Sequence, residues 1–173
     1  MYGTLAYEME VSVPASVAWA IYGSLRLISI TVPEFFRKID VIKGDGGPGT
    51  ILKVFFLPGS LFYSWEEEIV KVDNEKMVKA TNVHTGGYLD LGFNLFQVRF
   101  EVIKKTETSC ITRTTIVFDI KDGFEANASY VSILGFMDIM QAVTKYLEKT
   151  GHRCEDSNIA QPFHQFGNIF LNL

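Results

Sequence analysis

The chain has 173 residues, of which 47% are hydrophobic, and its formal net charge is −4. This size and composition predict one compact domain with a real hydrophobic core. The mild acidity and the lack of a basic stripe argue against nucleic-acid binding, and no apolar run approaches the length of a membrane span.

The first residues contain neither the basic region nor the apolar stretch of a signal peptide. We therefore expect a soluble protein in the reducing environment of the cytoplasm, as a monomer or a homodimer. Cys110 and Cys154 lie in different kinds of segment and are expected to be free thiols. The cysteines and the three histidines do not have the spacing of metal ligands, so we expect neither a metal nor another cofactor.

The N-terminal quarter of the chain predicts one strand and two short helices. Apolar and polar residues alternate over 5–13, which is typical of a half-buried strand. A first helix should follow Pro14, with Val17, Ile21 and Tyr22 on its buried face. A second helix is predicted over 25–32, because Pro33 cannot continue it.

The middle of the chain predicts an antiparallel meander, since strand-like runs alternate with good turn sequences. These runs cover residues 38–43, 50–57, 62–72, 76–84, 88–104 and 109–120.

After residue 123 the hydrophobic spacing changes to three and four residues, which predicts one long amphipathic helix to about Lys149. Gly151 is expected near its C-terminal cap. Residues 152–173 have no clear periodicity and are expected to form a poorly ordered tail, so the domain should span 1–151.

This order of elements predicts an α+β fold. A curved, seven-stranded antiparallel sheet would wrap around the long C-terminal helix and leave a hollow between them. Aromatic residues make up 13% of the chain, which suits either a large core or a cavity for a flat apolar ligand.

The segment 44–50 contains four glycines and a proline between two predicted strands. Gly44, Gly46, Gly47 and Gly49, together with Asp45, can form a turn with positive φ angles and uncovered amide groups. A phosphate-binding P-loop would need a lysine and a following helix, whereas a β-branched and aromatic strand follows here. A tight turn without a ligand and a brace for a pocket wall both remain open.

The glycine-rich loop, the order of elements and the C-terminal helix resemble the pathogenesis-related class 10 (Bet v 1-like) plant proteins over about residues 4–150. Segments 58–59, 72–76 and 86–92 resemble the norcoclaurine synthase branch, and 25–27 and 126–129 resemble norbelladine synthases. The resemblance implies a helix-grip fold with a large internal cavity. It also implies condensation of a phenethylamine, such as dopamine or tyramine, with an aromatic aldehyde, followed by Pictet–Spengler ring closure in norcoclaurine synthases.

The resemblance implies two catalytic residues, Lys79 as the general acid and Glu67 as the base. Two other polar positions of the branch are changed: Trp65 replaces a tyrosine and Val98 replaces an aspartate. Both changes count against efficient ring closure. A hairpin turning at 73–75 would place Glu67 and Lys79 nearly opposite each other on the inner face of the sheet.

Eight residues are expected to line the cavity and bind an aromatic or alkaloid ligand: Trp65, Val98, Phe56, Ile69, Val83, Phe36, Phe96 and Ile139.

Other interpretations stay open at this point. The acidic run 66–68 and Lys79 could lie on a solvated sheet face. The protein could be a non-catalytic carrier of alkaloids, phenolics or hormones, or it could isomerise or cyclise a bound alkaloid.

Overall fold

The structure is a computed structural model that describes residues 1–156, with side chains through Gly151. Seven antiparallel strands form one sheet in the order β1-β7-β6-β5-β4-β3-β2. The strands are β1 (Tyr2–Val11), β2 (Phe36–Lys43), β3 (Ile51–Phe56), β4 (Ser64–Asp73), β5 (Val78–Gly86), β6 (Phe93–Lys104) and β7 (Cys110–Ile120). The helices are α1 (Ala15–Tyr22), α2 (Arg26–Thr31) and α3 (Leu134–Asp156), with single 3₁₀ segments at Gly87–Leu91 and Glu125–Tyr130.

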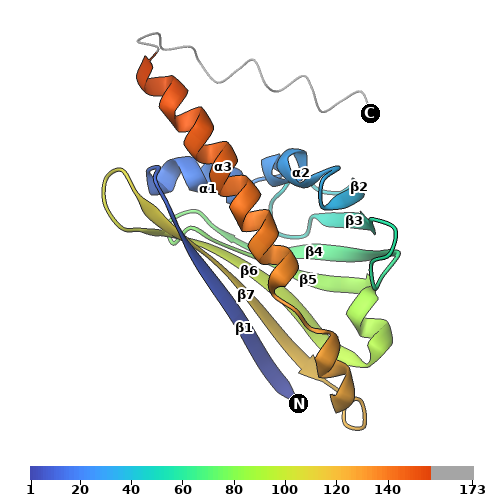
Figure 1. Cartoon of the computed structure of the whole chain (residues 1–173). Coiled ribbons are helices and arrows are strands. Elements are labelled where there is room, and N and C mark those ends of the chain that lie inside the picture. The colour runs from blue at the N-terminus through green and yellow to red at the C-terminus, as the bar shows by residue number, and fades with distance from the viewer. Residues whose placement is uncertain (157–173) are drawn as a thin grey trace.

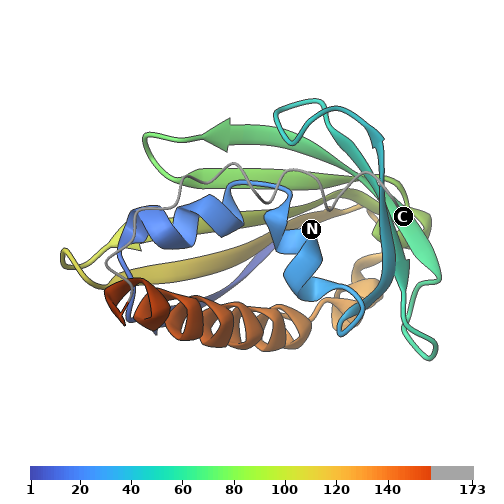
Figure 2. The same cartoon turned by 90° about the horizontal axis from the view of Figure 1, so that it is seen from above.

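The sheet curves around α3 on its concave side, and α1 and α2 lie on the same side (Figures 1 and 2). Alternation on β6 produces this arrangement, because Val98, Phe100 and Val102 point inward. Ile139 and Val143 of α3 are buried in the same core as these strand residues. Burial of each such side chain contributes about 1.5–3 kcal/mol. The predicted α+β fold and its order of elements are confirmed.

Two local predictions differ from the structure near the turns. The run 88–104 begins as a 3₁₀ turn, because Gly86, Gly87 and Gly92 all have positive φ and interrupt the strand. On α1, Val17 is 39% exposed, whereas Trp19 belongs to the buried face together with Ile21.

The long helix continues through Gly151 to Asp156, beyond its predicted end. Gly151 is not a cap. A Cβ at this position would lie 3.2 Å from Cγ1 of Val13, so the glycine permits close contact between α3 and the segment after β1. Residues 152–156 of the predicted tail are therefore helical, and 157–173 lie outside the described residues.

The glycine-rich loop is a closed turn between β2 and β3. Gly44, Gly46 and Gly49 have φ angles of 92°, 106° and 89°, which only glycine adopts readily. The buried Thr50 hydroxyl accepts a hydrogen bond from the Gly46 amide at 2.9 Å. The Asp45 carboxylate accepts one from the Gly47 amide at 3.1 Å. These amides have partners within the loop.

Substitutions in this loop should separate backbone strain from steric clash. A Cβ at Gly44 would lie 2.4 Å from Oγ1 of Thr50, whereas a Cβ at Gly49 would meet nothing within 4 Å. Gly49→Ala should therefore lose about 1–2 kcal/mol for positive φ alone. Gly44→Ala should lose a further 1–3 kcal/mol or so for overpacking. Urea unfolding of both variants measures the difference, and equal losses would contradict the role of Thr50.

Candidate active site

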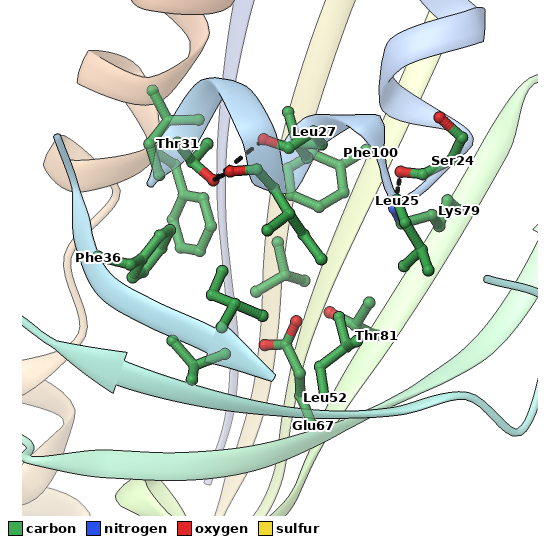
Figure 3. A pocket seen from close by; sticks show the side chains of 16 residues that line it. Ser24, Leu25, Leu27, Thr31, Phe36, Leu52, Glu67, Lys79, Thr81 and Phe100 are labelled. Atoms are coloured by element: carbon green, nitrogen blue, oxygen red, sulfur yellow. Dashed lines mark hydrogen bonds between the residues drawn. The ribbon is translucent and has the colours of Figure 1, made fainter. Parts of the chain in front are cut away.

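The candidate site is a cavity of about 70 Å³ bounded by α2, the inner face of the sheet and the start of α3 (Figure 3). Its wall is mostly apolar and includes Leu25, Leu27, Phe36, Leu52, Phe100 and Phe136. The expected large cavity is thus smaller than the roughly 300–1,000 Å³ of common small-molecule pockets. Two of its lining side chains, Phe100 and Phe136, pack edge to face with ring centroids 6.2 Å apart.

Lys79 enters the cavity from β5 with a side chain that is 5% exposed. Its Nζ donates a hydrogen bond to the Ser24 carbonyl oxygen at 3.3 Å, at the junction of α1 and α2. Nζ also lies 6.0 Å from the centre of the Phe100 ring. Burial lowers the pKa of Lys79 to about 8, although the nearby Glu67 carboxylate opposes this shift. The ammonium can therefore lose its proton near neutral pH.

Glu67 reaches the same cavity from β4, where it pairs with Leu52 of β3, and its carboxylate points into the cavity (Figure 3). Burial raises the pKa of Glu67 above the usual range of a carboxyl group. A hydrogen bond from Nε1 of Trp65 to Oε2 of Glu67, 3.1 Å long, opposes this shift, and so does the charge of Lys79. Burial thus moves the pKa values of the acidic and basic groups towards each other.

The sequence predicted that Glu67 and Lys79 lie opposite each other across the hairpin. The structure shows that they do not. Glu67 pairs with Val83 and Lys79 pairs with Val72, because the turn covers residues 74–77 and not 73–75, which moves the partners of the β4 residues further along β5. A bulge between residues 69 and 71 then moves the partner of Glu67 back by one position, onto the face of β5 that carries Lys79. Lys79 and Val83 are about 13 Å apart along β5 at roughly 3.3 Å per residue. No ion pair within residues 1–151 joins Glu67 and Lys79. A reacting group can therefore lie between the acid and the base.

The acidic run 66–68 is divided between the two faces of the sheet. Glu66 pairs with Lys53 at 3.3 Å, and Glu68 lies 3.9 Å from the exposed His84. Glu67 alone lines the cavity. The alternative of a wholly solvated acidic run is therefore wrong for Glu67, and the buried Lys79 is not a surface lysine.

Of the eight residues expected to line the cavity, Val98, Phe36 and Ile139 do so. The other five are buried or half-buried beside it. Trp65, Phe56, Val83 and Phe96 belong to the adjoining core. Ile69 is fully buried, with its backbone hydrogen-bonded to the glycine-rich loop.

The loop itself does not line the cavity, but it supports one wall. A Cβ at Gly46 would lie 3.2 Å from Cγ of Leu25, which does line it. This contact supports the interpretation that the glycine-rich loop braces the cavity wall, and not that it binds an anion.

Several lining residues were not predicted, and three had a signal in the sequence. Phe100 continues the inward alternation of Val98, Thr81 follows Lys79 on the same face of β5, and Phe136 is one helical turn before Ile139. The residues of α2 had no such signal, because a six-residue helix has too few turns to define a face.

The described residues offer no site for a metal, since no three histidine, cysteine or acidic side chains among them come together. In the same part of the chain, no helix combines the length and the apolarity needed to cross a membrane.

Known proteins share this fold and much of this sequence. The Pathogenesis-related protein Bet v 1 family matches residues 1–150. A norbelladine synthase from Narcissus pseudonarcissus is 36% identical over 160 residues, which cover 89% of this chain and 97% of the relative. S-norcoclaurine synthase 2 from Papaver somniferum is 34% identical over 69% of this chain, a match that spans 54% of that relative.

A solved structure of norcoclaurine synthase from Thalictrum flavum in complex with dopamine and hydroxybenzaldehyde superposes with a TM-score of 0.77. It is 27% identical and covers 86% of this chain and 88% of its own. A point mutant of the same enzyme with a transition-state analogue gives a TM-score of 0.79 at 28% identity, covering 87% of this chain and 97% of its own. The chain therefore belongs to the Pathogenesis-related protein Bet v 1 family.

Proposed function

We propose that this protein condenses a phenethylamine such as dopamine or tyramine with an aromatic aldehyde, in the manner of norbelladine synthase. The observation that carries the proposal is the placement of Lys79 and Glu67 in one apolar cavity without an ion pair between them. General acid–base catalysis is most efficient when the pKa of each group lies near the operating pH, and burial moves the pKa values of both Glu67 and Lys79 in that direction. The relationship to norbelladine and norcoclaurine synthases supports the same chemistry.

In the first step the amine nitrogen attacks the aldehyde carbon, and a C–N bond forms as the C=O π bond breaks. Glu67 as a carboxylate takes a proton from the nitrogen and passes it to the alkoxide oxygen, which gives the carbinolamine and restores the carboxylate. Lys79 as an ammonium then protonates the hydroxyl group, which leaves as water, and the nitrogen lone pair forms the C=N bond. The neutral Lys79 amine takes the remaining N–H proton, which gives the neutral imine and restores the ammonium, so one molecule of water is released for each imine.

We propose the imine, rather than a cyclised product, as the end of the reaction. Pictet–Spengler closure requires removal of a proton from the aromatic ring of the amine after C–C bond formation. Val98 lies in the cavity wall where the related branch has a carboxylate, and Trp65 cannot ionise as a tyrosine can. Among the residues that line the described cavity, this leaves Glu67, the base already assigned to imine formation, without the other two polar groups of the related branch.

The test is incubation of the protein with dopamine and 4-hydroxybenzaldehyde, followed by mass spectrometry before and after borohydride. Imine and cyclised product have the same mass, but borohydride adds two hydrogens only to the imine. We expect product formation above the buffer rate, with most of the product reduced. An unreduced product would indicate ring closure.

If binding of the aldehyde and amine is preserved and no product forms above the buffer rate, the condensation proposal fails. The non-catalytic carrier of hydrophobic metabolites would then be the better interpretation.

A further inference from the structure

The indole of Trp65 lies between the cavity residue Glu67 and a cluster of aromatic rings in the adjoining core. The ring centroid of Trp65 is 4.6 Å from that of Phe56, 5.6 Å from that of Phe62 and 5.9 Å from that of Tyr88. The side chain is only 9% exposed. Contacts on several sides restrict rotation of the indole, because a buried core is closely packed.

The chain makes specific room for this indole. Gly87 has a φ of +57°, and a Cβ there would lie 2.6 Å from Cε3 of Trp65. Tyr88 stacks on Phe96 with ring centroids 3.8 Å apart, and its hydroxyl donates to the Tyr130 carbonyl oxygen at 3.1 Å. The neighbours of the indole are therefore themselves fixed.

The polar edge of the indole faces the proposed base. Nε1 of Trp65 donates to Oε2 of Glu67 at 3.1 Å, and the two residues share one face of β4 because they are two positions apart. Among the described residues, no other group donates a hydrogen bond to the Glu67 side chain. It occupies one carboxylate oxygen and leaves the other free to meet a substrate.

We propose that Trp65 is a positioning residue that fixes the direction and favours the ionised form of the Glu67 carboxylate. This inference rests on the proposed function, in which Glu67 is the base. The indole N–H donates a hydrogen bond but does not transfer its proton. A donor stabilises the carboxylate more than the neutral acid, so the bond lowers the pKa of Glu67 against the effect of burial.

Trp65→Phe should lower kcat roughly ten-fold, the scale of one hydrogen bond to a charged group. KM should change little, because Trp65 lies outside the cavity wall. Loss of the donor raises the pKa of Glu67, so the acid limb of the kcat–pH profile should move to higher pH.

Trp19→Phe is a matched control, because Trp19 is also 9% exposed and its Nε1 donates to Oδ1 of Asn74 at 3.0 Å, away from the cavity. It should leave the pH profile unchanged. Equal profiles for Trp65→Phe and the wild type would overturn the inference.

A second measurement does not depend on catalysis. The chain has two tryptophans, so a ¹H–¹⁵N spectrum should contain two indole signals, and Trp19→Phe identifies the signal of Trp65. That signal should shift with pH in a single titration above the usual carboxyl range, and Glu67→Gln should abolish the titration.

A Trp65 signal that does not respond to pH would overturn the inference. A titrating signal in a protein that makes no product would instead support the Trp65–Glu67 bond and count against the proposed function alone.

Discussion

Lys79→Met should lower kcat for the condensation by at least about 10²-fold, the lower end of the usual contribution of a general acid. Methionine has a similar length but no proton to give to the departing hydroxyl group. Binding of 4-hydroxybenzaldehyde, measured by calorimetry, should persist because the apolar wall is intact. The variant should fold, since it removes a buried cation whose hydrogen-bond acceptor is the Ser24 carbonyl oxygen.

Lys53→Met is the matched control. Lys53 lies on β3, which is separated from β5 by β4, and its Nζ pairs with Glu66 at 3.3 Å and not with a cavity group. It should keep the wild-type kcat. If Lys79→Met also keeps the wild-type kcat, the assigned acid is wrong. If both variants lose activity equally, the loss reflects the general charge of the protein and not a proton donor.

Hydrophobic residues that recur every two residues predicted the strands of this fold, and hydrophobic residues that recur every three to four residues predicted its long helix. Alternation along β4 placed Trp65 and Glu67 on one face, and the structure keeps them together. The spacing of Phe136, Val143 and Leu147 predicted the long helix; Val143 and Leu147 belong to the core against the sheet, and Phe136 packs against that core. These predictions succeed because burial of one face or stripe is a local property of the sequence.

The dimensions of the site were not predictable in the same way. The turn at 74–77 places Lys79 opposite Val72, and the bulge near Val70 places Glu67 opposite Val83. No residue type in that run marks a bulge. The size of the cavity was not predictable either, because its wall includes contacts between residues far apart in the sequence, such as Phe100 and Phe136. Gly151 has the residue type of a cap, yet its neighbour Val13 comes from the other end of the chain.

Burial also explains how two ordinary side chains acquire their proposed roles. An exposed glutamate is fully ionised at pH 7 and an exposed lysine is fully protonated. In the cavity, desolvation raises the pKa of Glu67 and lowers that of Lys79 to about 8. Because Glu67 and Lys79 do not form an ion pair with each other, each can exchange a proton with a reactant that lies between them.

Glu67→Gln should lower kcat about 10²-fold or more and remove the acid limb of the pH profile. In the wild type, kcat with both substrates saturating should rise as Glu67 loses its proton, above the usual carboxyl range. It should fall near pH 8, where Lys79 loses the proton that it must donate. Glutamine has the same shape, and its carbonyl oxygen can still accept from Trp65, so the change removes the charge and the proton exchange.

The remaining activity of Glu67→Gln should show a basic limb below pH 8. The Glu67 carboxylate raises the pKa of Lys79, so the neutral amide must let that pKa fall. Glu66→Gln, which changes the outward neighbour paired with Lys53, should keep both limbs in place. A basic limb that stays at pH 8 in Glu67→Gln would mean that another group donates the proton. A full acid limb in that variant would mean that another group accepts it.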